Sequence, residues 1–547
     1  MNNKMNTDYQ WKRFFPFSIT RDTQEKAINF ILSSFLKSNK RYVIAELGTG
    51  TGKSAIGLTV GRYLNSIRIP NDDYVPGTYV LTTQKVLQEQ YVHDFGPPNG
   101  ELQSIKSASN YKCEFYTGNT CGESQRLVKN ETQGSAFWRK CTTDCCYKRQ
   151  KKLFIDSEEG TTNYSYFMAE TKYGGKLKPR ELLVLDECHN LESELSKFVE
   201  TSVSEKFAKD TLKLKWPSTS NPTKMIEWLR TTYIPAAVAH LEQAQLMILK
   251  LNMKDKLKDF EMISSKIELL DKHICKMHRF MEMWSDDNWV MSIVESEEKG
   301  LKKLEFKPVD VSPYTNDLLL SYGRRVLMMS ATIVDKDVFC ATLGLRQDEV
   351  DFLSIDSPFP IENRPIYYAP VGAMAQSTID QTLPKLAEMV KLIMEQHKGD
   401  KGIIHCQSYK IASYIKRNVK SSRLLMHDSF NREEMIAKHA ASSKPTILLS
   451  PSLSEGIDLK DELSRFQILC KIPFPYLGDP LTKKRMTKNR LWYPYQTAKT
   501  IIQSVGRSIR NETDHAITYI LDSNWEKFYQ QHENMFPESF KKALKKA

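Results

Sequence analysis

The sequence predicts an α/β protein with two parallel-sheet domains, the first interrupted by a small cysteine-rich insertion and by an α-helical insertion. Three observations predict this fold class. Short apolar runs end in polar clusters in both halves of the chain, as strands buried on both faces of a parallel sheet do. Five of the ten cysteines lie between 113 and 146. No glycine occurs between Gly175 and Gly300, where apolar residues recur at helical spacing.

Length and charge limit the class of protein. The chain has 547 residues, enough for roughly three to four domains of about 150 residues each. Its net charge of +12 favours a polyanionic partner, most often nucleic acid, and a solubilising surface charge is the alternative. The polar N-terminus does not resemble a signal peptide, and no apolar stretch reaches the roughly 18 residues of a membrane helix. We therefore expect a cytosolic protein whose clustered thiols bind metal.

A glycine-rich loop follows the strand expected at Ile44 and Ala45. Its glycines allow main-chain N–H groups to curl around a phosphate at the start of a helix. Lys53 is expected to reach the β- and γ-phosphates of a nucleotide, and the Ser54 hydroxyl to hold Mg²⁺. Taken alone, the pattern has a chance glycine-rich loop as its alternative. The candidate nucleotide-binding residues are Gly48, Thr49, Gly50, Thr51, Gly52, Lys53 and Ser54.

An acidic cluster follows the next apolar run, at 181–185. This run is typical of a buried parallel strand, and α/β sheets bind ligands at the carboxyl ends of their strands. We expect Asp186 to support Mg²⁺ and Glu187 to polarise an attacking water, with His189 beside them. A solvated loop is the alternative for this short pattern alone, but its position after a buried strand and a phosphate loop favours the functional interpretation.

Further candidates follow three downstream segments. The run at 326–329 ends in Ser330, Ala331 and Thr332, and the strand expected at 446–449 precedes Gly456 and Asp458. Gln503, Arg507 and Arg510 come last, and two arginines three residues apart share one face of a helix. Such a pair is suited to stabilising a triphosphate in the transition state. An ordinary salt-bridging surface helix is the alternative.

The order of these motifs resembles that of superfamily 2 helicases, and more narrowly the XPD/DinG-like iron–sulfur branch. Arg21 and Gln24 resemble that branch's adenine-contacting R-x-x-Q element. The stretch at 82–84 resembles its DNA-contacting motif. The stretch at 162–164 resembles the T-N-Y that precedes the acidic box, which is residues 186–189 in this chain. The resemblance extends from Arg21 to about Asp522.

The resemblance implies two RecA-like motor domains that bind ATP and Mg²⁺ between them. It implies an ATP-dependent DNA helicase that moves 5′ to 3′ on single-stranded or forked DNA as a monomeric motor. The chain is short for this branch, which suits a compact version encoded by a virus or mobile element. The resemblance also implies nucleotide contacts from Arg21, Gln24, Gly456 and Asp458. The implied catalytic residues are Lys53, Asp186, Glu187, His189, Gln503, Arg507 and Arg510.

The clustered cysteines form a candidate metal site. By ligand type, four thiolates can bind zinc or an iron–sulfur cluster, and zinc is the commoner occupant. The position within the resemblance implies a [4Fe–4S] cluster, with zinc as the alternative. The implied ligands are Cys113, Cys121, Cys141 and Cys145, with Cys146 as the alternative fourth ligand. Interleaved cations and aromatics suit single-stranded DNA, or pack as a small core; they include Lys140, Arg149, Phe115, Tyr116 and Phe137.

The helical insertion carries a heptad seam, more typical of a core than of a binding site. In the resembled family this position holds an arch domain that closes over the DNA strand with the cluster domain. A basic stretch at 471–490 is expected to be a loop that contacts phosphates or is merely solvated. The seam comprises Phe260, Ile263, Ile267, Leu270, Ile274, Met277, Met281 and Trp284. The expected divisions are 1–105, 156–202 and 306–344 for motor domain 1, 106–155 for the cysteine-rich insertion, 203–305 for the arch-like insertion and 345–547 for motor domain 2.

Two other functions fit the same residues. One is an ATP-driven translocase that remodels protein–DNA complexes without processive unwinding. The other is a zinc-bearing nucleic-acid-binding protein with an inactive ATPase site, against which Lys53, Glu187, Arg507 and Arg510 all argue because the ATPase motifs are intact.

Overall fold

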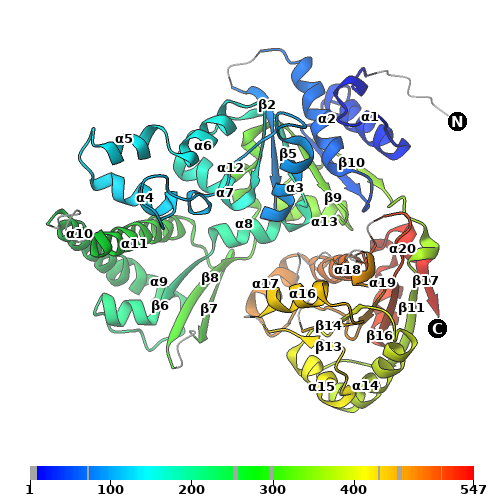
Figure 1. Cartoon of the computed structure of the whole chain (residues 1–547). Coiled ribbons are helices and arrows are strands. Elements are labelled where there is room, and N and C mark those ends of the chain that lie inside the picture. The colour runs from blue at the N-terminus through cyan, green and yellow to red at the C-terminus, as the bar shows by residue number, and fades with distance from the viewer. Residues whose placement is uncertain are drawn as a thin grey trace.

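Two parallel β-sheets organise the computed structural model of this chain (Figure 1). Both sheets have seven strands, and a three-stranded antiparallel sheet accompanies the first. The prediction of two parallel-sheet α/β domains is confirmed. The structure describes residues 9–70, 73–250, 257–295, 300–428, 431–451, 459, 461–506, 508–509 and 511–546. Within these residues, every helix is too short or too polar to span a membrane.

The first sheet places the ends of its central strands side by side. Its strand order is β10-β1-β9-β5-β2-β4-β3, and all its strand pairs are parallel. Register pairs Glu46 with Ser330 and Asp186 with Met329, so the phosphate loop, the acidic box and the Ser330 segment leave one edge. The strands are β1 (Tyr42–Leu47), β2 (Val75–Thr82), β3 (Gln103–Ser104), β4 (Glu159–Asn163), β5 (Arg180–Asp186), β9 (Gly323–Ser330) and β10 (Val350–Ile355).

Helices cover both faces of this sheet, which explains why its strands are continuous apolar runs. Alternate residues point to opposite cores: Leu183 and Leu185 face one, and Leu182 and Val184 face the other. The second core includes helices α1 (Asp22–Leu36), α2 (Lys53–Ser66) and α3 (Lys85–Phe95). The first core includes α7 (Tyr164–Ala169), α8 (Leu191–Val199), α12 (Ser312–Leu318) and α13 (Lys336–Leu343).

The boundary expected at 344/345 is wrong. Strand β10 follows it in sequence but pairs with β1 along its whole length, from Tyr42 with Val350 to Leu47 with Ile355. The first sheet therefore continues to Ile355, and the segment after it leads into the second domain. A short edge strand at this position carries no motif of its own, which is why the sequence did not reveal it.

The second domain, at the lower right of Figure 1, has the strand order β13-β14-β12-β15-β16-β11-β17. The strand expected at 446–449 is confirmed as β14, which pairs in parallel with β12. Its strands are β11 (Ile366–Gly372), β12 (Gly402–His405), β13 (Leu424–Met426), β14 (Ile447–Ser450), β15 (Phe466–Leu469), β16 (Ile517–Asp522) and β17 (Leu544–Lys546). Its helices are α14 (Ile379–Gln396), α15 (Tyr409–Val419), α16 (Arg432–Ala441), α17 (Pro480–Lys488), α18 (Trp492–Val505), α19 (Asn524–His532) and α20 (Glu538–Ala543).

The two insertions of the first domain pack against each other (Figure 1). The cysteine-rich segment forms α4 (Cys121–Leu127), α5 (Ala136–Thr143) and α6 (Cys146–Asp156). The helical segment forms α9 (Pro222–Trp228), α10 (Ile234–Leu249) and α11 (Leu257–Met283). Phe260 joins Leu127 and Phe137 in one core, so the heptad seam on α11 is buried packing. Arg126 Nε and Glu268 Oε2 form an ion pair at 2.5 Å between the insertions.

The sequence did not reveal the antiparallel sheet at the base of the helical insertion. It comprises β6 (Thr201–Ser204), β8 (Lys302–Pro308) and β7 (Trp289–Glu295), in that spatial order. The heptad seam dominated the pattern of this region, and the two hairpin strands lie beyond its end. This sheet connects the helical hairpin to the first domain.

Candidate active site

The phosphate loop joins the end of β1 to the start of α2. Gly52 adopts a left-handed conformation with φ +79° at the N-cap, and Lys53 is the first helical residue. The N-terminus of α2 therefore presents main-chain N–H groups and the positive end of the helix dipole, which favours an anion. Lys53 Nζ contacts the Leu47 carbonyl at 3.4 Å, and Lys53 and Ser54 line the adjoining cavity.

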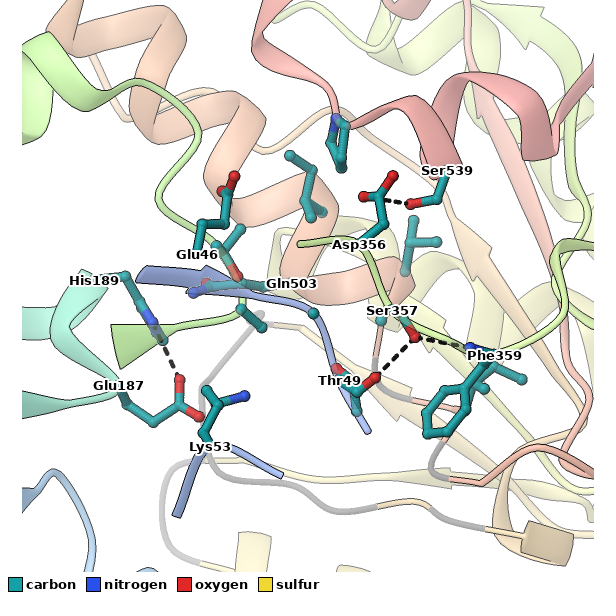
Figure 2. Close-up of a pocket in the computed structure, with 18 of the residues that line it drawn as sticks. Glu46, Thr49, Lys53, Glu187, His189, Asp356, Ser357, Phe359, Gln503 and Ser539 are labelled. Carbon is teal, nitrogen blue, oxygen red and sulfur yellow. Dashed lines mark hydrogen bonds and ion pairs between the residues drawn. The ribbon is translucent and has the colours of Figure 1, made fainter. Parts of the chain in front are cut away.

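The segment after β10 holds the phosphate loop from outside. Ser357 Oγ donates a hydrogen bond to the Thr49 carbonyl at 2.8 Å (Figure 2). The Phe359 ring lies against Gly50, where an added Cβ would lie 2.2 Å from Phe359 Cζ. Gly50 also has φ +89°, so both the backbone and the close approach require glycine here. The segment that leads from β10 into the second domain thus contacts the phosphate loop directly.

In the acidic box, the carboxylates of Asp186 and Glu187 and the imidazole of His189 lie next to one another. Asp186 Oδ1 accepts a hydrogen bond from the Glu187 amide at 3.0 Å. Glu187 has a left-handed backbone, φ +52°, and its Oε2 lies 3.3 Å from His189 Nδ1. The same nitrogen is hydrogen-bonded to Ser330 Oγ at 2.7 Å. Strained backbone of this kind is concentrated at functional sites.

Burial raises the pKa of Asp186 to about 6, and the neighbouring charge of Glu187 adds to the effect while Lys53 opposes it. The folded protein therefore disfavours the ionised carboxylate relative to the unfolded chain, and its charge is lost as pH falls through about 6. A buried carboxylate with a raised pKa gains from a divalent cation, which compensates the charge that burial penalises. The arrangement is suited to Mg²⁺ held by Asp186 and Ser54.

A cavity of about 640 Å³ lies between the two domains and adjoins these groups (Figure 2). The first domain contributes the phosphate loop and the acidic box, and the second contributes α18 and α20. Among the described residues, none accepts a hydrogen bond from the buried Gln503 amide nitrogen. An unsatisfied buried donor on a cavity wall is suited to binding a polar ligand. The predicted site residues that line the cavity are Gly48, Thr49, Lys53, Ser54, Asp186, Glu187, His189 and Gln503.

Other predicted residues lie elsewhere. Arg21 Nη1 donates to the Gly50 carbonyl at 2.6 Å, and Gln24 Oε1 accepts from the Arg21 amide at 3.0 Å. These two residues support the phosphate loop from α1 and do not line the cavity. Helix α18, which carries Gln503, ends at Val505, and the expectation that Arg507 and Arg510 share one helix face falls on residues outside those that the structure describes. Gly50, Thr51 and Gly52 belong to the phosphate loop but do not line the cavity. Four further predicted site residues lie outside the described residues: Gly456, Asp458, Arg507 and Arg510.

Sequence reasoning missed Glu46, the penultimate residue of β1. Its carboxylate accepts hydrogen bonds from the Ile333 and Val334 amides at 2.7 and 2.9 Å, and from Ser354 Oγ at 2.8 Å. Val334 has a left-handed backbone with φ +70°. Glu46 therefore ties the segment after Ser330 to the strand that carries the phosphate loop. An acidic residue directly before a phosphate loop was the available signal, but its partners are distant in sequence.

The basic stretch at 471–490 was expected to be a loop, and this is wrong over its second half, which forms α17. Arg485 and Lys488 on this helix contact the first domain. Lys488 Nζ pairs with Asp310 Oδ2 at 2.6 Å, and Arg485 Nη1 pairs with Glu192 Oε1 at 3.1 Å. Glu192 also accepts from Trp492 Nε1 at 3.0 Å. These cations stabilise the domain interface next to the acidic box, so they are committed to protein contacts.

The cysteines form a second, small cavity. Cys113, Cys121, Cys141 and Cys145 line it together. Cys146 does not line it; its Sγ donates instead to the Lys112 carbonyl at 3.2 Å. Within the described ranges, no group of three or more potential ligands is already arranged to hold a metal ion, so thiols must turn inward to bind one.

The donor chemistry around these thiols is compatible with thiolate ligation. The Phe115 and Tyr116 amides donate to Cys113 Sγ at 3.3 and 3.2 Å, as N–H groups do around cluster sulfurs. Burial raises the pKa of Cys141 to about 11, so metal binding at neutral pH would displace a proton from this thiol.

The cations and aromatic rings of this insertion mostly contact other residues of the same insertion. The Tyr116 and Phe137 rings pack edge to face at 4.7 Å. Lys140 and Arg149 both pair with Glu114, at 2.8 and 2.5 Å. The core interpretation therefore holds for these two rings, while the two cations form ion pairs on the surface of the insertion.

Comparisons with known proteins agree with this geometry. Residues 18–215 match a family model described as type III restriction enzyme, res subunit, and residues 390–543 match one described as helicase C-terminal domain. The ATP-dependent DNA helicase XPD of Sulfolobus acidocaldarius is 22% identical over 553 residues, covering 93% of this chain and 97% of that protein. The chain is thus similar in sequence to DNA helicases named XPD and DinG.

Further matches are a partial sequence match to a DinG helicase and structural matches to solved XPD structures. The ATP-dependent DNA helicase DinG of Photobacterium profundum is 26% identical over 243 residues, which is 40% of this chain but only 34% of that protein. A solved structure titled as an XPD helicase covers 97% of this chain with a TM-score of 0.64 and 17% identity. The S. tokodaii Xpd4 structure covers 96% with a TM-score of 0.58 and 14% identity. These structures show a common fold.

Proposed function

We propose that this chain is an ATP-dependent DNA helicase that translocates 5′ to 3′ along single-stranded DNA and unwinds duplex DNA as a monomeric motor. One observation carries the proposal: a single interdomain cavity is lined by Lys53 and Glu187 from the first domain and by Gln503 from the second. A nucleotide that contacts both walls favours closure of the domains, and its hydrolysis allows them to open. The chain's similarity to DNA helicases named XPD and DinG supports DNA as the partner.

The residues of the cavity have distinct roles in hydrolysis. Lys53 and the N–H groups of the loop bind the phosphates, and Ser54 and Asp186 hold Mg²⁺, which neutralises phosphate charge when bound. Glu187 orients the attacking water and accepts its proton, and His189 holds Glu187 in place through the 3.3 Å contact. Arg507 and Arg510 are proposed to stabilise the charge that develops on the transferred phosphate.

Two sets of contacts support coupling between hydrolysis and domain movement. The Glu46 carboxylate links the strand before the phosphate loop to the segment after Ser330. Glu192, three residues after His189, accepts hydrogen bonds from Trp492 and Gln496 of the second domain at 3.0 and 2.8 Å. A change in the acidic box therefore reaches α18 through one side chain.

We further propose that Cys113, Cys121, Cys141 and Cys145 hold a [4Fe–4S] cluster. Their common cavity, which Cys146 does not line, supports this ligand set over one that includes Cys146, although Cys146 Sγ lies 3.6 Å from Cys121 Sγ. The two N–H donors to Cys113 Sγ suit a thiolate at that position. The cluster would contribute structure, because its insertion packs on α11 through α4. The two packed insertions together enclose the DNA strand, which therefore enters from a free end or at a gap.

Tailed duplexes test the proposal. With ATP, the protein should separate a duplex carrying a 5′ single-stranded tail at least about tenfold faster than one carrying a 3′ tail, because a motor moving 5′ to 3′ runs towards the duplex on a 5′ tail and away from it on a 3′ tail. Displacement of a short labelled strand, measured by gel or fluorescence, gives both rates. A reversed preference would contradict the polarity. Removal of a bound protein block without strand separation would favour the translocase.

A further inference from the structure

Helix α3 connects the DNA-facing part of the proposed motor to the ATP cavity. It begins at Lys85, immediately after the stretch at 82–84 that resembles a DNA-contacting motif. Its first turns face the cavity, and the lining residues of this segment are Thr83, Gln84, Val86, Leu87 and Gln90. A helix held at both ends moves as one rigid body, so displacement at its start is transmitted along it.

The same helix is tied to the start of the cysteine-rich insertion. Gln88 Nε2 donates to Ser104 Oγ at 2.6 Å and to the Ile105 carbonyl at 2.8 Å. Lys85 Nζ donates to Asn110 Oδ1 at 2.7 Å. Movement of the insertion therefore also acts on α3.

The far end of α3 contacts the Mg²⁺ carboxylate. Tyr91 OH donates to Asp186 Oδ2 at 3.0 Å. Tyr91 is 3% exposed and Asp186 5% exposed. The Tyr91 ring packs against Phe95 at 6.0 Å within the core of the first domain. Tyr91 is buried, and its hydroxyl holds one oxygen of the carboxylate while the Glu187 amide holds the other.

We propose that Tyr91 is a positioning residue that orients Asp186 for Mg²⁺ and transmits movements of α3 to this carboxylate. The proposal rests on the proposed ATPase function. A carboxylate that accepts one hydrogen bond on each oxygen keeps a single orientation, and such supporting bonds govern metal affinity. Loss of the hydroxyl frees Asp186 Oδ2 and also uncouples it from α3.

The Tyr91→Phe variant tests this with the loss of one oxygen atom. Its Mg²⁺ concentration for half-maximal binding of a fluorescent ADP, measured without DNA, should rise about tenfold, as for other supporting contacts of metal ligands. Stimulation of ATP hydrolysis by single-stranded DNA should fall as well. Tyr164→Phe is the matched control. Tyr164 OH donates at 2.8 Å to the main-chain carbonyl of the same Asp186, so the control loses a buried bond but leaves the carboxylate untouched.

The possible results distinguish failure of the positioning role of Tyr91 from failure of the proposed ATPase function. A raised Mg²⁺ requirement in Tyr91→Phe but not in Tyr164→Phe supports the inference. An unchanged Mg²⁺ requirement in Tyr91→Phe overturns it, while DNA-stimulated hydrolysis by the wild type would leave the proposed function standing. Equal shifts in both variants also overturn it, because they would reflect general loosening near β5. Absence of Mg²⁺-dependent ADP binding in the wild type would overturn the proposed function and the inference together.

Discussion

Replacing Glu187 with glutamine is expected to abolish ATP turnover while nucleotide and DNA remain bound. Glutamine preserves the shape of the side chain but cannot accept a proton from water, and loss of a general base costs about 10²–10⁴ in rate. Steady-state hydrolysis measured with single-stranded DNA, together with binding of a fluorescent ATP analogue, checks both halves of the prediction.

Glu194→Gln is the matched control for this variant. Glu194 lies seven residues further along and pairs with Lys197 at 3.0 Å, away from the cavity lining. Its neutralisation should leave the rate within about twofold, because this carboxylate pairs with an exposed lysine and does not line the cavity. Hydrolysis by Glu187→Gln at more than half the wild-type rate would show that another group activates the water.

Serine substitutions at Cys145 and Cys146 are expected to have opposite effects although the residues are adjacent. Cys145→Ser removes one of the four thiols that line the common cavity, and should lose most of the bound iron. Strand separation should fall at least about tenfold while ATP hydrolysis stays within a few-fold, because the four cysteines line a separate cavity from the nucleotide site. Cys146→Ser should retain both iron and strand separation.

After anaerobic purification, visible absorbance and elemental analysis measure the bound iron and zinc. A strand-displacement assay measures strand separation. The reverse pattern would make Cys146 the fourth ligand. Zinc in the wild type and in Cys146→Ser would replace the cluster with a zinc site. Equal loss of hydrolysis, DNA binding and folding in Cys145→Ser would contradict the separation of structural and catalytic roles.

Strands and the loops that follow them could be predicted from local pattern. Parallel strands buried on both faces are continuous apolar runs, and the ligand-binding residues follow their carboxyl ends. This is why the phosphate loop and Asp186, Glu187 and His189 were found from sequence, and why the structure brings them to one cavity.

Contacts between distant segments could not be predicted in the same way. Tyr91 and Asp186 are 95 residues apart, and Glu46 and Ile333 are 287 residues apart. Each is an ordinary residue in its local pattern, and only the packing of the sheet brings it to its partner. Arg485 resembled a phosphate contact because charge alone does not distinguish a nucleic-acid surface from an interface between domains.

The rate of ATP hydrolysis with and without single-stranded DNA tests the central claim most directly. The wild-type protein should hydrolyse ATP slowly alone and at least about tenfold faster with DNA, because DNA acts on the same interdomain cavity through the second domain and α3. A rate that DNA leaves unchanged, in protein shown to bind both ATP and DNA, would contradict an ATP-driven DNA motor.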